Sequence, residues 1–153
     1  MHLFCWDTKS DAFYAHTVAR NTDVPGTPYI IKSFEIDMQS NRMGFRLNSA
    51  PISHTVPPEL LSTAVTRGTL QLTPSGQLIV LMADHQTTGG YPRIGTVISA
   101  DMPSLAQMPI GSSFGIAWIS MEEAEALLLH QETNLQQLEN ACKFRLQEYF
   151  SEK

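Results

Sequence analysis

The residue types best suited to chemistry gather in one segment, which reads Ala-Asp-His-Gln-Thr-Thr-Gly-Gly-Tyr-Pro-Arg over residues 83–93. It directly follows an apolar run, so it is expected at the end of a strand, where loops often hold functional groups. Paired glycines let a backbone approach a ligand closely, and a guanidinium pairs well with a carboxylate or phosphate. The segment is therefore predicted to recognise a small anionic substrate, with a plain tight turn as the alternative. The predicted binding residues are Gln86, Thr87, Thr88, Gly89, Gly90, Tyr91 and Arg93.

A second candidate is the pair Arg42 and Arg46, which stand four residues apart in the stretch 40–47. In a strand they would share one face, while the apolar residues between them point to the other. Two arginines on one face are suited to grip an anionic substrate. They are equally typical of a solvated strand face, so both interpretations stay open at this point.

Several other kinds of site are not supported by the spacing of the reactive residues. The five histidines show no His-x-His or His-x₃-His spacing and the two cysteines do not pair with them, so no metal site is expected. No Gly-Lys-Ser/Thr ending of a nucleotide-binding loop occurs. Asp84 and His85 are neighbours that could form an acid–base pair. Neighbours in a strand point to opposite faces, however, so the two side chains need not cooperate. No catalytic residue is assigned.

Short strands are predicted to hold these segments. The strongest signal is a hairpin in which two apolar runs flank Pro74-Ser75-Gly76. From Leu78 to Met82 the second run is apolar throughout, which predicts a strand covered on both faces. Asp101 is placed to cap a short helical turn over 101–107. The predicted strands are 29–31, 34–38, 43–47, 69–73, 77–82, 94–98 and 113–119, whereas 1–28 is expected to be irregular and 51–58 a linker.

A long helix is predicted over residues 120–150, where neither Pro nor Gly occurs. Ser120 and Glu123 have the spacing of a capping box, in which each side chain accepts the other residue's backbone N–H. An apolar stripe follows, which usually packs on the helix's own domain; a partner helix is the alternative. The residues that repeat every seven positions are Leu128, Leu135, Cys142 and Tyr149, with Leu127, Leu138 and Leu146 beside them.

Composition limits the remaining classes. The chain has 153 residues, of which 42% are hydrophobic, and its formal net charge is -5. This suffices for one folded domain, taken as residues 29–153, and an acidic chain without a basic tract does not favour nucleic acid. Two cysteines, no signal-peptide pattern and no long apolar run predict a reduced, soluble, cytoplasmic protein without a membrane span. Short strands and one terminal helix favour a mainly β fold, a barrel or sandwich closed by the helix.

Two motifs resemble a known family. The stretch Ala83 to Arg93, with Gly68-Thr69-Leu70-Gln71 ahead of it, is similar to the most recognisable part of the family of 5-oxoprolinase C subunits, also called KipA or allophanate hydrolase subunit 2. The stretch Asn41 to Leu47 matches that family's Arg-Met-Gly-aromatic-Arg-Leu motif. The resemblance covers roughly residues 34–128 and only the family's C-terminal half. Arg93 stands where many relatives carry Lys.

The resemblance implies a cyclophilin-like β-barrel and a role inside a larger complex. Family members act with a B subunit of the KipI, or allophanate hydrolase subunit 1, family. With a third protein, the A subunit, they form an ATP-dependent hydrolase that opens 5-oxoproline to glutamate, so this chain is expected to be inactive alone. One alternative that it implies is a carboxyltransferase domain of a urea or amide carboxylase, in which carboxybiotin is the donor. Another is a non-catalytic regulatory module that binds a KipI-like partner.

Overall fold

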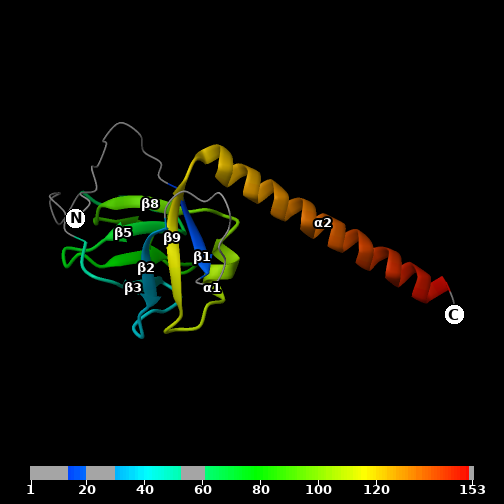
Figure 1. Ribbon diagram of the computed structural model, residues 1–153, viewed down its shortest axis with the longest axis horizontal. Helices are drawn as coiled ribbons and strands as arrows, with labels where there is room; N and C mark the ends of the chain where they lie inside the picture. Colours follow the sequence, from blue (N-terminus) through cyan, green and yellow to red (C-terminus); the bar gives the residue numbers. More distant parts are fainter. Residues whose placement is uncertain (1–13, 20–29, 53–60, 152–153) are drawn as a thin grey trace.

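A computed structural model of the chain describes residues 14–19, 30–52 and 61–151; for 14–19 and 30–32 the description is of the backbone. Figure 1 shows a curled sheet from which one long helix projects. The elements are β1 (Tyr14–Ala19), β2 (Ile30–Ile36), β3 (Gly44–Asn48), β4 (Thr63–Ala64), β5 (Thr69–Leu72), β6 (Leu78–Leu81), β7 (Thr88–Gly89), β8 (Arg93–Val97), α1 (Met102–Ala106), β9 (Ser113–Ile119) and α2 (Met121–Ser151). The predicted mainly β fold with a long C-terminal helix is confirmed.

The strands close into a barrel in the order β1-β8-β5-β6-β3-β2-β9, and β9 pairs back with β1. Neighbouring strands are antiparallel except for β1 and β8, which are parallel. Closure leaves no open edge in this sheet, which short strands of an all-β domain otherwise have to protect. The two-residue strands β4 and β7 form a separate ribbon outside the barrel.

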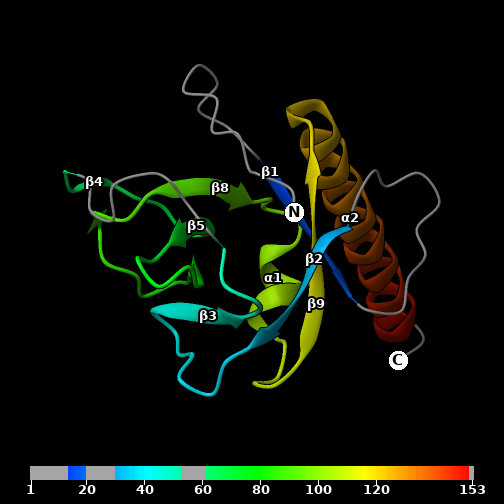
Figure 2. The same cartoon turned by 60° about the vertical axis from the view of Figure 1, so that its left-hand side comes forward.

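The core follows from the alternation of apolar side chains along the strands. In β3, Phe45 and Leu47 are buried while Gly44, Arg46 and Asn48 are not. Facing strands supply Leu70, Val80 and Phe114. The short helix α1, which lies beside the barrel strands in Figure 2, places Leu105 in the same cluster. Successive residues of a strand point to opposite faces, so the side chains that alternate with these core residues lie on the outer face of the sheet. This outward set does not take part in the core.

Two strand predictions need correction. Residues 14–19 lie inside the segment expected to be irregular, yet they form β1 between β8 and β9. Its partners come from the far end of the chain, so its own sequence gives little sign of it. The run over 78–82 was expected to be covered on both faces. Only Leu78 and Val80 of β6 are buried on the core face, and the alternate residues are half-buried. The rest of 1–28 and most of the predicted linker lie outside the described residues.

The helix α2 begins where the capping box predicts. The Ser120 N–H donates to Glu123 Oε2 at 2.8 Å, and the Glu123 N–H donates to Ser120 Oγ at 3.2 Å. Gln131 Nε2 donates to the Ala100 carbonyl oxygen at 3.1 Å, which ties the first turns to the barrel. Beyond that point Leu135 and Leu138 are about three-fifths exposed. The expected packing on its own domain is therefore wrong for the far half of α2.

Asp101 occupies the predicted N-cap position of α1, but its side chain makes no capping hydrogen bond. Among the described residues, no helix is both long and apolar enough to cross a membrane.

Glycines at two turns differ in one respect that can be measured. Gly76 (φ +79°) and Gly111 (φ +83°) both adopt the left-handed conformation. A Cβ at Gly76 would lie 2.7 Å from the Ile52 carbonyl oxygen, whereas one at Gly111 meets nothing within 4 Å. We expect Gly111→Ala to lower the free energy of unfolding by about 1–2 kcal/mol, the cost of a left-handed alanine. Gly76→Ala should lower the free energy of unfolding further. Its methyl group would push residue 52 away from residue 76 and weaken the hydrogen bond from the Ile52 N–H to the Gly76 carbonyl. Equal losses in urea unfolding would contradict this account.

The turn between β2 and β3 predicts a pH dependence of stability. The Asp37 carboxylate accepts hydrogen bonds from the Gln39 N–H and from Asn48 Nδ2, each at 2.7 Å. These bonds, the Gln39 one first, hold the pKa of Asp37 below its ordinary value of 3.8. A lowered pKa contributes stability that is present above pH 3.8 and is lost as the pH falls through the folded-state pKa.

Asp37→Asn should therefore remove part of the fall in Tm that the natural chain shows below pH 3.8. Asn48→Ala keeps the carboxylate and its bond to Gln39, so it should remove less of that fall. Thermal unfolding followed by circular dichroism across this range measures both. Identical pH slopes for the natural chain and Asp37→Asn would show that the turn does not contribute.

Candidate functional site

A cavity of about 620 Å³ lies on the outer face of β3, β6 and β5. Its floor is the outward set left by the core: Arg46 in β3, Ile79 in β6 and Gln71 in β5. These three stand in one cross-strand row, because Arg46 pairs with Ile79 and Ile79 pairs with Gln71. Directly paired residues point to the same face of a sheet, so the register itself brings them together.

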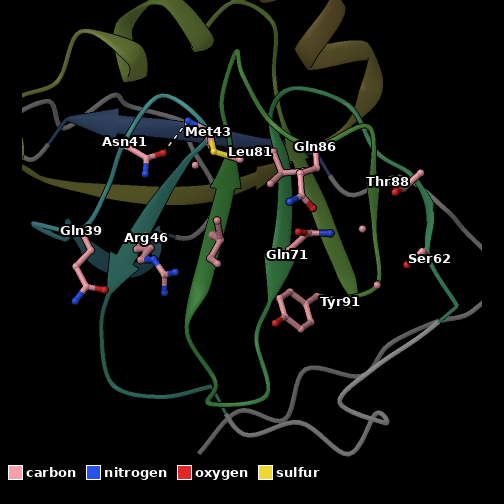
Figure 3. A pocket seen from close by; sticks show the side chains of 14 residues that line it. Gln39, Asn41, Met43, Arg46, Ser62, Gln71, Leu81, Gln86, Thr88 and Tyr91 are labelled. Atoms are coloured by element: carbon pink, nitrogen blue, oxygen red, sulfur yellow. Dashed lines mark hydrogen bonds between the residues drawn. The ribbon is translucent and has the colours of Figure 1, made fainter.

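The ribbon of β4 and β7 and the loop after it form the roof of this cavity. Ala64 pairs with Thr88, and the Val65 N–H donates to the Thr87 carbonyl oxygen at 3.0 Å. Figure 3 shows how Thr88, Gln86 and Tyr91 lie around the cavity opposite Arg46 and Gln39. The roof therefore comes from the predicted loop and the floor from strands distant in the sequence.

Gln71 is the most unusual residue of the floor. It is 5% exposed, and its Nε2 is a buried donor without a hydrogen-bond partner among the described residues. A Cβ at Gly89 would collide with this Nε2, so the glycine allows the roof to close directly over the amide. A buried donor without a partner costs about 1–3 kcal/mol, which proteins usually avoid outside functional sites.

The backbone beside Arg46 is fixed by a buried hydroxyl. Ser40 Oγ accepts the Arg46 N–H at 2.9 Å and donates to the Arg46 carbonyl oxygen at 3.3 Å. The Arg46 side chain itself is exposed to the cavity, and it is the one charged group among the described residues that line it. The site therefore combines one positive charge with neutral amide and hydroxyl groups.

Six of the nine predicted binding residues line the cavity, and three do not. Arg42 does not line the cavity; its Nε pairs with Asp84 Oδ2 at 2.7 Å and its side chain is 86% exposed. Thr87 contributes its backbone to the roof. Arg93 Nη1 donates to the Ala64 carbonyl oxygen at 3.3 Å, which ties β8 to the ribbon. The six that line it are Arg46, Gln86, Thr88, Gly89, Gly90 and Tyr91.

Sequence reasoning did not assign a site role to Gln71, although a signal for it was present. It alternates with Leu70 and Leu72 in the strand Thr69-Leu70-Gln71-Leu72, and both leucines are buried in the core. Alternation alone therefore places Gln71 on the opposite face. That this face is roofed, and the amide buried, depends on the ribbon. Other lining residues without a predicted role are Gln39, Asn41, Met43, Gly44, Ser62, Ile79 and Leu81.

The arrangement is suited to binding more than to nucleophilic chemistry. Its polar groups are donors and acceptors of neutral amides and hydroxyls, and its single cation can hold one anionic group. Ile79 supplies an apolar surface in the middle of the floor. A cavity of this size with a few convergent polar groups is typical of a small-molecule site.

The chain is similar to one known family and to named proteins within it. The family model "Carboxyltransferase domain, subdomain A and B" matches residues 27–117. Two curated relatives are both named as the C subunit of 5-oxoprolinase. The protein of Haemophilus influenzae is 44% identical over 103 residues, 67% of this chain and 33% of the relative. That of Escherichia coli K12 is 45% identical over 105 residues, 69% of this chain and 34% of the relative.

The chain thus spans about a third of the length of these relatives. Among solved structures, TTHA0988 superposes with a TM-score of 0.46 and 25% identity, over 73% of this chain and 22% of that one.

The matched range contains β2 to β8, most of β9 and every residue that lines the cavity, while α2 lies beyond it. It covers more than half of the chain. The chain belongs to the family of the carboxyltransferase domain, subdomain A and B.

Proposed function

We propose that this chain is a component of an ATP-dependent 5-oxoprolinase, which opens 5-oxoproline to glutamate together with the A and B subunits of that enzyme. The names of both curated relatives support a place in this enzyme. The observation that favours a direct part in the reaction is the cavity, which combines Arg46 and Gln71 on one floor within the family-matched range. A reaction that consumes ATP also agrees with the cytoplasm as the compartment.

The chemistry of lactam opening needs binding groups of this kind. A lactam is resonance-stabilised, and transfer of the terminal phosphate of ATP to its oxygen, with release of ADP, makes the ring carbon electrophilic. Water then adds to that carbon, the ring C–N bond breaks to release the amine, and a second water displaces phosphate from the resulting acyl phosphate. Charge then develops on oxygen atoms, which fixed donors and cations stabilise without a nucleophile from the protein. In this proposal Arg46 holds the substrate carboxylate, Gln86 and Tyr91 orient the ring, and the Gly89 and Gly90 amides face the developing charge.

The residues present do not fit a nucleotide triphosphate in this cavity. One guanidinium faces it, and the chain has no Gly-Lys-Ser/Thr loop to hold phosphates. Arg42 and Arg93, which were predicted to help bind the anion, pair with Asp84 and with the Ala64 carbonyl instead. We therefore assign ATP to the partner proteins, and to this chain the task of holding the lactam where it meets them.

A second candidate is favoured by the name of the family itself. In a carboxyltransferase the same cavity would hold urea or another small amide, and carboxybiotin on a partner would be the donor. The amide nitrogen would then bond to the carboxyl carbon while the bond between that carbon and biotin breaks, and the amide proton would pass to biotin. The protein again has to orient an amide and exclude water. Both candidates share the substrate class and differ in the second substrate.

The test is phosphate release from ATP and 5-oxoproline by this chain mixed with the purified A and B subunits, with each component omitted in turn. We expect turnover only in the complete mixture. Arg46→Gln should reduce kcat/KM by at least about tenfold, because a hydrogen bond to a charged group is lost. Arg42→Gln is the matched control, since that side chain pairs with Asp84 and does not line the cavity, and it should leave kcat/KM unchanged.

Turnover that does not depend on this chain, with partners shown to be active beside a full-length C subunit, would contradict the proposal. Carboxylation of urea from carboxybiotin under the same conditions would support the second candidate instead.

A further inference from the structure

The amide of Gln71 is held in place from three sides and is left without a partner among the described residues. Its strand pairs with β6 on one side and with β8 on the other, and its neighbours Leu70 and Leu72 are fixed in the core. Gly89 lies against Nε2 from above. The side chain is almost fully removed from solvent, with an exposed fraction of 5%. Such an amide cannot turn out to water, and its Nε2 gains a partner only where a molecule in the cavity comes between it and Gly89.

The order of residues along the cavity floor, from Gln71 to Arg46, defines the chemical groups that a matching ligand would carry. Gln71 and Arg46 are separated by one strand, and two strand spacings place their Cα atoms roughly 10 Å apart. Between them lies Ile79, and Gly44 keeps the surface beside it low: a Cβ there would be 3.0 Å from Ile79 Cγ2. Across the floor, the hydrogen-bond donor of Gln71, the apolar side chain of Ile79 and the cation of Arg46 therefore follow in that order.

We propose that Gln71 selects the ligand of this cavity by donating a hydrogen bond to a carbonyl oxygen, while Arg46 pairs with a carboxylate at the other end. The ligand class is a compact amide or lactam that carries an acid, with an apolar ring or chain lying over Ile79. The choice of 5-oxoproline within this class rests on the proposed function. The assignment of the two anchors rests on the geometry alone.

The physical basis for selectivity is the cost of leaving Gln71 unpaired. A ligand with a carbonyl oxygen restores the hydrogen bond that burial removed, whereas a ligand without one keeps the donor dry and unpartnered. Sites built around a buried donor reject analogues that lack the acceptor much more strongly than apolar pockets reject a missing methylene. Gln71 is a binding residue in this account, and the test separates it from a structural role.

Three probes of similar size dissect the row. 5-Oxoproline has both the carbonyl and the carboxylate, cyclopentanecarboxylate lacks the carbonyl, and 2-pyrrolidinone lacks the carboxylate. Each is titrated into the ¹⁵N-labelled chain, and the side-chain NH₂ signals of Gln71 are followed by NMR. Those signals are assigned by their loss in Gln71→Met, a variant of similar length without a donor. We expect them to move with 5-oxoproline and with 2-pyrrolidinone but not with cyclopentanecarboxylate.

The binding affinities of the three probes complete the test. 5-Oxoproline should bind at least about tenfold more tightly than either analogue, as expected for one hydrogen bond to a buried group. In Gln71→Met this advantage over cyclopentanecarboxylate should disappear while cyclopentanecarboxylate itself binds as before. In Arg46→Gln the advantage over 2-pyrrolidinone should disappear instead. Gln71→Glu replaces the donor by an acceptor and should weaken 5-oxoproline further than Gln71→Met does.

Gly89→Ala is a second route that leaves Gln71 unchanged. Its methyl group would displace the amide, so 5-oxoproline should again lose its advantage even if Gln71→Met does not fold. Gln71 signals that do not move at the highest soluble concentration of 5-oxoproline overturn the proposal. An unchanged preference for 5-oxoproline in folded Gln71→Met overturns it as well.

Failure of the wider function would look different. If the Gln71 signals and the affinity cycle behave as expected but the mixture with the A and B subunits releases no phosphate, the ligand class stands and 5-oxoprolinase activity does not. Active mixtures whose KM for 5-oxoproline is the same with Gln71→Met would retain that activity and refute the role of Gln71.

Discussion

Alternation of side chains along β3, β6 and β5 is the constraint on which both the core and the cavity depend. Phe45 and Leu47 enter the core only if Arg46 points outward, and Leu70 and Leu72 do the same for Gln71. A slip of one residue in either pairing would exchange the two faces and lose the core and the site together. Hydrophobic burial therefore specifies the pairing register, and the same register fixes the positions of the residues on the cavity floor.

The roof adds a different kind of constraint. It consists of a ribbon of two-residue strands, too short to be stable by itself, so contacts with the barrel have to hold it. The Arg93 bond to the Ala64 carbonyl is such a contact, whereas the Val65 bond to the Thr87 carbonyl joins the two sides of the ribbon to each other. The result is a covered amide at Gln71 beside an open side at Arg46. A low-dielectric end and a wetter charged end within one cavity favour ligands with one neutral and one ionised group.

The helix α2 is governed mainly by local interactions. Its capping box fixes the start, and pairs such as Lys143 with Glu139, at 2.6 Å, support the solvated face. Leu135, Leu138 and Leu146 nonetheless remain more than half exposed. Most helices owe their stability to the packing of one face, and this one receives such packing from the described barrel only over its first turns. Local signals therefore account for where the helix begins, but the barrel does not account for its far half.

The sequence alone determined the features that depend on neighbours within three or four residues. These are the hairpin around Gly76, the alternating strands, the capping box at Ser120 and the motif that indicates the family. It also indicated the loop within residues 83–93 that lines part of the cavity. Tertiary structure decided the rest. Two arginines of the same type and similar setting behave differently because Arg42 meets Asp84 while Arg46 meets the cavity. Formation of β1 and the burial of Gln71 depend on partners far away in the chain. Local patterns fix which face of a strand a residue is on, but they carry no information about what the fold places over that face.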